Sequence, residues 1–567
     1  MGASEQFRLD SRELGGLPIV CHFLKRAGLD ALLERYLPAS GLRLSPAAAI
    51  GVVVRNLCLG REPVYGLGEW ASRFEPGLLG LGREQLGALN DDRVGRALAC
   101  LFDADRASLL TELLLGVIAE FELDLSQLHN DSTSITFSGA YAQADGRPRG
   151  GKPTPAITFG HNKDHRPDLK QLLWILTVCA DEAVPIAYRS AAGNTSDDQT
   201  HIATWDGLVA LCGRADFLYV ADSKLCTREA MGHIAGRGGR FLCVLPRSRK
   251  EDAWFRDWAQ SHSPDWVEAT RRPPRRQGDP EQVWSVFPAP LPSAEGYRIV
   301  WVHASDKHGR DAQARRARIE RGLKALEALQ RRLASPKSRL RSRVAVEQAA
   351  AAALAEADAG RWLRFTVGET IEERFRQERR GRPGASTRYR KLVKTRYSLS
   401  FEIDAEAVAY DATTDGCFPL VSNDTTLSDA ELLAAYRYQP NLEKRHHQLK
   451  GVQLVAPVLL KDPARIEGLL CCYFIALLCH ALIEREARSA MAERGIDALP
   501  LYPEERSCGA PTAARILELF AGVSRHHLIK DDAVVQVFQP TLTPLQLELL
   551  ALLGMPDSAY ANAAANS

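Results

Sequence analysis

Between Leu125 and Pro246 the sequence alternates extended apolar segments with helical ones in a fixed order. Segments rich in β-branched and aromatic residues, separated by turn residues, are typical of strands. The first three predicted strands lie in LDLSQLHNDSTSITF, PAITFG and QLLWILTVCADEAVPIAYRSA. A helix (TSDDQTHIATWDGLVAL), a buried strand (FLYVADS), a second helix (TREAMGHIAG) and a further strand (RFLCVLP) follow. The order predicts an α/β domain built on a mixed sheet.

This order of segments matches the ribonuclease-H-like plan, in which the first and fourth strands lie side by side at the centre of the sheet. Asp131 in LHNDST and Asp222 in FLYVADS each close an apolar, strand-like run. We therefore expect both aspartates at the ends of neighbouring strands, with their carboxylates able to reach one ion. A lone aspartate at a strand end is more often a turn or cap residue, so the pairing of the two carries the prediction.

A third acidic residue, Glu443, lies in the amphipathic stretch YRYQPNLEKRHHQLKG. A capping box of Ser428 with Glu431 opens the preceding helix, and Pro440 interrupts it. Such a glutamate among Lys and Arg is normally a surface ion pair. Together with the two aspartates, however, it completes a set of carboxylates that suits two Mg²⁺ or Mn²⁺ ions, which clamp the attacking and leaving oxygens of a phosphodiester. The prediction is nucleic-acid phosphoryl transfer.

With 567 residues the chain has room for three or four domains of about 150 residues each. The long interval between the second aspartate and the glutamate predicts an insertion of mixed helix and strand that divides the α/β core. The expected regions are a helical N-terminal domain for end binding or dimerisation (1–122), the first part of the core (123–246), the insertion (247–423), the last core helix (424–455) and a helical C-terminal region (456–567).

The net charge of +2 gives no sign of a nucleic-acid partner, but the distribution of charge does. Between Arg374 and Arg396 many basic residues accompany a single acid, Glu378, and the stretch holds Tyr389 and is followed by Tyr397. Such a run favours contact with phosphate, although like-charged blocks also occur in solvated tails. The residues expected to contact DNA here are Arg388, Arg390, Lys391, Lys394 and Arg396.

The longest apolar run, GLLCCYFIALLCHALI (468–483), contains a histidine and is shorter than the roughly 20 residues that span a bilayer. It is expected to be a buried core helix, with no membrane partner. The N-terminus lacks the apolar stretch of a signal peptide. The twelve cysteines show neither zinc spacing nor a disulfide framework. A reduced bacterial cytoplasm, in association with the nucleoid, is the expected location.

The sequence around Glu443 resembles that of the DDE transposases of bacterial insertion sequences, in particular the group marked by the signature Y-x2-R-x3-E-x6-K. That signature falls on Tyr436, Gln439, Glu443 and Lys450, so glutamine replaces the family arginine, and Arg437 is close by. The stretches FGHNKDHRPDLKQLLWILTVCADEAVPIAYRSAAGNTSDDQT and LNDDRVGRALACLF are also similar to this family.

The resemblance implies a ribonuclease-H-like core with Asp131, Asp222 and Glu443 as catalytic metal ligands. It also implies cut-and-paste transposition, with binding of double-stranded DNA as terminal inverted repeats and target, and a paired-end complex of at least two protomers. Tyr436, Arg437, Gln439 and Lys450 would contact DNA.

Two other functions fit the same residues. One is a ribonuclease-H-like nuclease or resolvase that cuts without joining. The other is a catalytically silent DNA-binding protein descended from a transposase, in which the three carboxylates need not converge.

Several other polar residues are open to a structural interpretation. The charged turn Lys163, Asp164, His165, Arg166 and Asp168 favours a structural role over a DNA or supporting role. Asn194 and Asp197 in GNTSDD are typical of helix capping. Metal binding by His446 and His447 is not expected, because no partner stands at zinc-ligand spacing.

Overall fold

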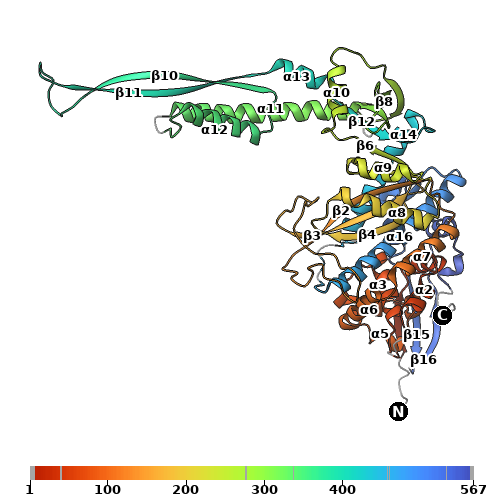
Figure 1. Ribbon diagram of the computed structural model, residues 1–567. Coiled ribbons are helices and arrows are strands. Elements are labelled where there is room, and N and C mark those ends of the chain that lie inside the picture. Colours follow the sequence, from red (N-terminus) through yellow and green to blue (C-terminus); the bar gives the residue numbers. More distant parts are fainter. Residues whose placement is uncertain are drawn as a thin grey trace. The chain divides into compact units, whose positions relative to one another are not determined.

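The computed structural model describes residues 7–38, 41, 43–274, 278–335, 338–455, 458, 460–531 and 533–561. The chain forms two compact units, one of residues 1–243 together with 434–567 and the other of residues 244–433 (Figure 1). Both contain helices and strands, so the protein is mixed α/β as the segment order predicts. The first unit contains all three predicted carboxylates.

The N-terminal part of the first unit is mainly helical, as expected. Ser45 caps α3 by accepting a hydrogen bond from the backbone of Ala48, and Asn90 caps α6 through Arg93. One strand, β1, precedes the helices and was not predicted. The elements are β1 (Phe7–Glu13), α1 (Leu17–Arg26), α2 (Leu29–Tyr36), α3 (Pro46–Leu59), α4 (Leu67–Ser72), α5 (Arg83–Leu86), α6 (Asp91–Asp103) and α7 (Arg106–Glu120).

The central helix of this unit is α16 (Pro463–Glu493), which contains the long apolar run. It is long and apolar enough to cross a membrane, but 94% of its most apolar window is buried inside the protein. It packs against α3 and α6, and Gly468 lets the backbones approach closely, since a Cβ there would lie 2.3 Å from the carbonyl oxygen of Leu98. The described part of α16 is therefore a core helix.

The C-terminal region is not purely helical, contrary to the prediction. β15 pairs antiparallel with both β1 and β16, joining the two ends of the chain in one small sheet. β15 and β16 are only 7 and 6 residues long, and β15 depends on pairing with the distant β1, which no local pattern indicates. The elements after α16 are β13 (Leu499–Tyr502), β14 (Arg506–Cys508), α17 (Ala513–Glu518), β15 (Ser524–Lys530), β16 (Ala533–Phe538) and α18 (Pro544–Leu552).

Five strands of the first unit form its sheet in the order β4–β3–β2–β5–β6. The first and fourth strands of the segment, β2 and β5, are adjacent and parallel, as predicted. The assignment of PAITFG was wrong: it makes only an isolated bridge between Thr158 and Gln171, and the following segment supplies two strands through a tight turn. The elements are β2 (Gln127–Phe137), β3 (Lys170–Cys179), β4 (Pro185–Ala192), α8 (His201–Cys212), β5 (Leu218–Val220), α9 (Arg228–Gly236) and β6 (Arg240–Val244).

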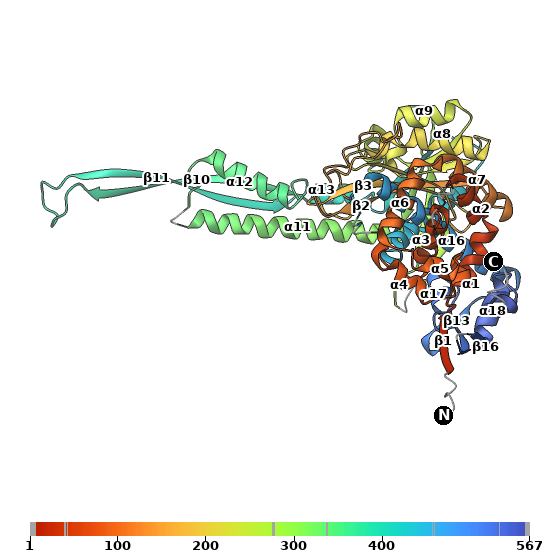
Figure 2. The same cartoon turned by 90° about the horizontal axis from the view of Figure 1, so that it is seen from below.

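The second unit combines antiparallel strands in the order β12–β9–β8–β7 with a long helical and ribbon segment. Figure 2 shows the β10–β11 ribbon running alongside α11 and α12 and continuing past them. The stretch AEAVAYDA forms α13, which Asp404 caps by accepting from the backbone of Ala407. The elements are α10 (Lys250–Trp258), β7 (Val267–Arg272), β8 (Gln282–Pro288), β9 (Arg298–Ala304), α11 (Ser305–Ala334), α12 (Arg343–Glu356), β10 (Leu363–Gln377), β11 (Tyr389–Ile403), α13 (Ala405–Ala412), β12 (Cys417–Ser422) and α14 (Asp429–Tyr436), which runs on into the first unit.

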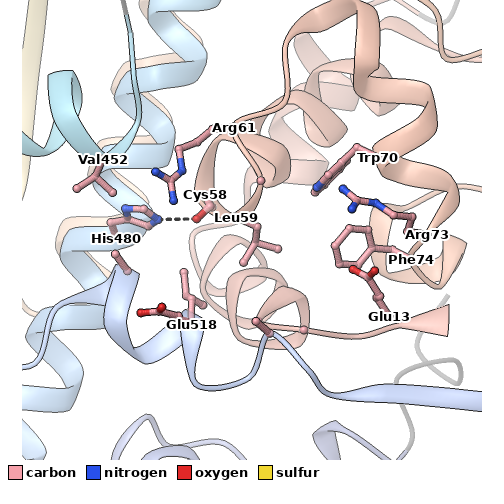
Figure 3. A pocket seen from close by; sticks show the side chains of 16 residues that line it. Glu13, Cys58, Leu59, Arg61, Trp70, Arg73, Phe74, Val452, His480 and Glu518 are labelled. Carbon is pink, nitrogen blue, oxygen red and sulfur yellow. Dashed lines mark hydrogen bonds between the residues drawn. The ribbon is translucent and has the colours of Figure 1, made fainter. Parts of the chain in front are cut away.

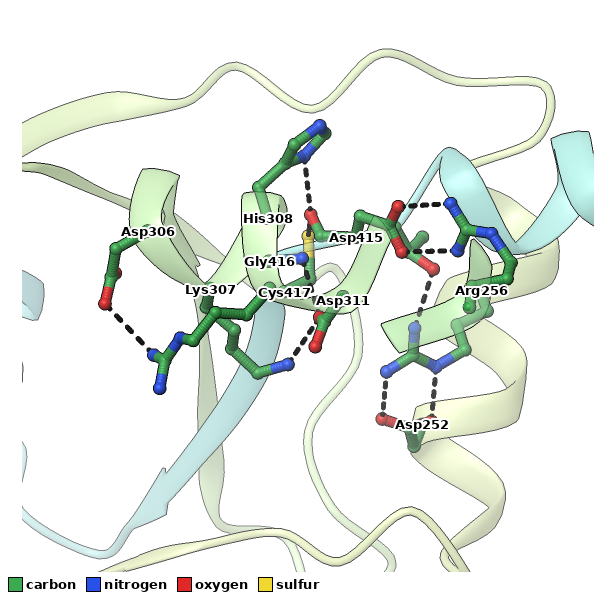
Figure 4. A network of polar contacts seen from close by, with 12 residues as sticks. Asp252, Arg256, Asp306, Lys307, His308, Asp311, Asp415, Gly416 and Cys417 are labelled. Atoms are coloured by element: carbon green, nitrogen blue, oxygen red, sulfur yellow. Dashed lines mark hydrogen bonds and ion pairs between the residues drawn. The ribbon is translucent and has the colours of Figure 1, made fainter. Parts of the chain in front are cut away.

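A polar network fixes the first turns of α11 to the loop before β12 (Figure 4). Arg315 and Asp415 form a two-pronged ion pair with contacts of 2.7 and 2.6 Å, and both residues are buried. Asp311 accepts from Lys307 at 2.6 Å and from the backbone of Gly416 at 3.0 Å. The helix that supports the ribbon is thereby attached to the sheet of its own unit.

Replacing Arg315 by Met should leave the Asp415 carboxylate buried and unpaired, at a cost of roughly 3–5 kcal/mol to the second unit. We expect faster hydrogen exchange at β12 and at the first turns of α11. Arg310→Gln is the matched control, because Arg310 forms an exposed pair with Asp306 on the same helix and should cost about 1 kcal/mol or less. Equal protection in the two variants would show that the network is dispensable.

Candidate functional site: three carboxylates around Tyr436

The parallel pairing of β2 with β5 sets the positions of the two aspartates. The register matches Leu128 with Tyr219 and His129 with Val220. Continued by two residues, it brings Asp131 level with Asp222. Asp131 lies within β2 and not at its end, because β2 runs on to Phe137 in pairing with β3, so that part of the prediction was wrong. Asp222 does lie just beyond the end of β5, after Ala221, and caps the next turn by accepting from the backbone of Lys224.

The Asp222 carboxylate is close enough to Asp131 to affect the ionisation of Asp131. The pKa of Asp131 is raised to about 6: burial is the largest cause and the charges of Asp222 and Asp197 add to it, while Lys163 and a backbone hydrogen bond oppose the rise. The site therefore concentrates negative charge in a partly desolvated place. That environment favours a bound cation.

Lys163 and Asp197 belong to this site, although the sequence suggested structural roles for the segments that carry them. The Lys163 ammonium lies 3.6 Å from Asp131 Oδ1 and 3.0 Å from Asp197 Oδ2. It also donates to the carbonyl and hydroxyl oxygens of Ser132 at 2.7 Å. Asp197 accepts from that same hydroxyl at 2.7 Å. The sequence around Lys163 gives no local signal of this, since the contact depends on how the loop folds over β2.

The helix that carries Glu443, α15 (Gln439–His447), is held by buried polar contacts on its inner face. The Gln439 side chain hydrogen-bonds the ring of His129 at 2.9 Å and the carbonyl of Asn130 at 3.3 Å, both on β2. Arg445 donates to the carbonyls of Glu182 and Ala183. These contacts leave Glu443 on the exposed side of the helix.

The Arg445 contacts also stabilise the turn between β3 and β4. Glu182 and Ala183 have φ angles of 53° and 54°, a left-handed conformation that suits a two-residue hairpin but is strained for residues other than glycine. The Arg445 guanidinium is itself paired with Glu484 of α16 at 2.6 Å, in a buried ion pair. One arginine thus connects the glutamate helix, the sheet and the core helix.

Tyr436 is the residue that all three carboxylates influence. The pKa of its phenol is raised to about 12, mainly by burial and in smaller part by the charges of Asp222, Glu443 and Asp131. Tyr436 stands at the end of α14, one short break before α15. The break falls just before Pro440, as predicted, and Ser428 with Glu431 forms the expected capping box.

The other predicted DNA contacts differ in their accessibility. Gln439 is buried and engaged with β2, so its amide is not presented to a ligand. Lys450 lies in a π-helical turn (Gln448–Val452) and pairs with Asp164 at 2.7 Å. Arg437 is half-buried. The charged turn that contains Lys163 and Asp164 therefore contacts both Asp131 and Lys450.

The basic residues predicted in the insertion lie on the β10–β11 ribbon of the second unit. Lys391 pairs with Glu373 and Arg396 with Glu372, each at 2.6 Å. Arg388, Arg390 and Lys394 have no acidic partner among the residues that the structure describes. Their guanidinium and ammonium groups are exposed.

His446 was not expected at the site. It is buried, and its Nε2 lies 3.8 Å from Asp131 Oδ2, which is too far for a hydrogen bond. Burial, with the nearby charges of Lys163 and Lys450, lowers its pKa to about 3, so the ring is neutral at physiological pH. Its position directly after Arg445 on the inner face of α15 was visible only once the helix was placed against β2.

Carboxylate oxygens are the donors that hard divalent cations such as Mg²⁺ prefer. The three carboxylates do not yet form a closed ligand set. No three His, Cys, Asp or Glu side chains in the described ranges lie together closely enough to hold an ion. Glu443, the most exposed of the three, has the greatest freedom to change its rotamer.

A cavity of about 420 Å³ in the same unit is separate from the carboxylates, none of which lines it (Figure 3). Arg61 and Arg73 from the N-terminal region and Glu518 from α17 border it. The ring of His480 is bonded to the carbonyl of Cys58 at 3.0 Å. The charges on its wall have both signs.

No model of a known protein family matches the chain, and no curated protein sequence matches it. The fold and the acidic site therefore define the class of the protein. It is a mixed α/β protein whose sheet and helices bring together an acidic site with a lysine counter-charge.

The raised pKa of Asp131 predicts that Asp131→Asn stabilises the metal-free protein near neutral pH. An unfolded aspartate ionises near pH 4 and the folded one near pH 6, so folded wild-type protein loses stability as pH rises through this window. Thermal unfolding in a chelator should show the variant more stable at pH 7.5 by about 1–3 kcal/mol. The gain should vanish below pH 4.

Asp168→Asn is the control for this measurement, because Asp168 is exposed and pairs only with its neighbour Arg166. It should show no pH-dependent gain. Equal or lower stability of Asp131→Asn across the whole pH range would refute the assignment of a desolvated, ionised Asp131.

Proposed function

We propose that the protein is a DDE transposase that cuts and joins phosphodiester bonds at the ends of a bacterial insertion sequence. One observation carries the proposal: the register of β2 and β5 sets Asp131 level with Asp222, and Glu443 influences the same tyrosine hydroxyl as both of them. The adjacency of β2 and β5 and the alternation of helices and strands after them support a ribonuclease-H-like core, which is the fold we propose for the first unit.

Asp131, Asp222 and Glu443 would hold two Mg²⁺ or Mn²⁺ ions, which when bound supply an activated nucleophile and neutralise charge on the phosphate in the transition state. Binding of DNA and metal would bring Glu443 inward from the exposed side of α15. Gln439 and Arg445 would act as positioning residues, because they fix α15 to β2 and to the turn between β3 and β4.

The chain's own cations would take part in handling the phosphate backbone. Lys163 balances Asp131 and Asp197 in the metal-free protein, and ion binding would release it to contact phosphate. Lys450 would exchange Asp164 for a phosphate oxygen. Tyr436 keeps its proton because of its raised pKa, so its hydroxyl would donate a hydrogen bond and not act as a base.

The partners follow from the resemblance in Y-x2-R-x3-E-x6-K. They are double-stranded DNA, as terminal inverted repeats and as target, and a second copy of the chain in a paired-end complex. The cytoplasm of a bacterial cell, at the nucleoid, is the location that such a substrate implies.

Asp131→Asn, Asp222→Asn and Glu443→Gln should each reduce Mg²⁺-dependent cleavage of insertion-sequence ends by at least about 100-fold, since each removes charge that acts on the transition state. End binding, measured by gel shift, should persist. Asp168→Asn should cleave at the wild-type rate. Cleavage by Asp131→Asn at the control's rate would refute the proposed site.

A strand-transfer assay with linear donor ends and a supercoiled target separates the related functions. A transposase gives joined products, whereas a nuclease or resolvase gives only nicked or linear target. Binding without cleavage by the wild-type protein, in either Mg²⁺ or Mn²⁺, would identify a catalytically silent DNA-binding protein.

A further inference from the structure

The β10–β11 ribbon has two different faces beyond the helices that support it. Side chains alternate between faces along each strand, so residues 371, 373 and 375 share one face with their cross-strand partners. Near its base this face is core: Val367 and Leu399 are buried against α11 and α12. The same face then continues past the helices without cover (Figure 2).

Large apolar side chains follow this uncovered face toward the tip. Ile371 and Phe375 are each 65% exposed, Val393 58% and Tyr389 50%. The register pairs Phe375 with Lys391, which places Val393 and Tyr389 diagonally on either side of Phe375. The Glu373–Lys391 ion pair crosses this face between Val393 and Phe375, so the apolar side chains form a stripe with one charged pair in it. Exposed apolar side chains of this size cost free energy in water unless something covers them.

Basic side chains occupy the opposite face and the tip. Arg376 lies directly across from Arg390 in the ladder, and two like charges in this position repel each other unless an anion lies between them. Neither arginine has an acidic partner in the part of the chain that the structure describes. The same holds for the exposed tip residues Arg379, Arg380, Arg382 and Arg388.

We propose that this ribbon is a DNA-bending arm that lays its apolar stripe in the minor groove of double-stranded DNA. The arginines would reach past the edges of the ribbon to the phosphates on both sides of the groove, and the phosphates would relieve the repulsion between Arg376 and Arg390. Apolar side chains inserted from the minor groove unstack base steps and kink the duplex. Phe375 and Tyr389, the bulkiest residues of the stripe, are the wedge.

A polyanion suits this surface better than a second protein copy does. A protein partner would cover the apolar stripe but would leave the arginines of the tip and of the opposite face unpaired. DNA offers sugar and base surface to the stripe and phosphates to the arginines at the same time. The arm requires DNA as the ligand but does not require the carboxylate site, so the inference goes beyond the proposed transposition chemistry.

The test is bending of a linear duplex of about 100 bp and mixed sequence, shorter than the roughly 150 bp persistence length, followed by energy transfer between its ends and by ligase-mediated circle formation. The full-length wild-type protein should increase circle formation about tenfold or more. Phe375→Ser with Tyr389→Ser should abolish the increase while keeping the affinity for DNA within about threefold.

Leu392→Ser is the matched control, since Leu392 is 39% exposed on the opposite face of the same ribbon, across from Arg374. It should bend DNA as the wild type does. Arg376→Gln with Arg390→Gln should weaken binding and reduce the slope of log affinity against log salt by about 2, one for each lost phosphate contact.

Wild-type bending by the Phe375 and Tyr389 double variant would overturn the proposal. The proposal would also be overturned if sedimentation showed that this double variant converts a dimer to monomers while DNA bending is unchanged. The stripe would then join two copies of the chain. Asp131→Asn separates this inference from the proposed function: it should bend DNA fully and cut none. Cutting by Asp131→Asn would refute the catalytic assignment and leave the arm intact.

Discussion

The candidate site depends on one short parallel ladder between β2 and β5. Only Gln127–His129 and Leu218–Val220 pair, yet this contact fixes the register of two segments that are far apart in sequence. The other elements of the site are attached to β2. Gln439 joins the glutamate helix to this strand, and Lys163 donates a hydrogen bond to Ser132 of the same strand. A slip of one residue would turn Asp131 to the opposite face of the sheet and separate it from all of these partners.

The electrostatics of the site work against folding. Carboxylates held close together in a partly buried place repel each other, and Lys163 offsets only part of the cost. The protein tolerates this because rigid, buried contacts surround it. Arg445 with Glu484, and Gln439 with His129, lie on the inner side of α15 and leave the outer side free. The contacts that stabilise α15 thus lie on its inner side, and the carboxylate of Glu443 on its outer side remains accessible to a ligand.

Local signals predicted local structure well. The caps at Ser45, Asn90 and Ser428, the break at Pro440 and the adjacency of β2 and β5 could all be inferred from residue type and segment order. Features that depend on tertiary contact could not. Asp131 lies inside its strand because pairing with β3 continues through the polar residues that follow it. Gln439 is buried because its side chain forms a hydrogen bond with the ring of His129 on β2. The strands of the C-terminal region form only by pairing with the distant β1.

The position of α16 has a consequence for biosynthesis. The N-terminal helices α3 and α6 pack against a helix that the ribosome makes only near the end of the chain. At about 5–20 residues per second, those helices wait on the order of 20–75 s for their core partner. During that time their apolar faces are uncovered, so the nascent chain is a natural client of chaperones. The glutamate helix is also synthesised late, and a chain whose translation stops early therefore carries both aspartates without the means to complete the site.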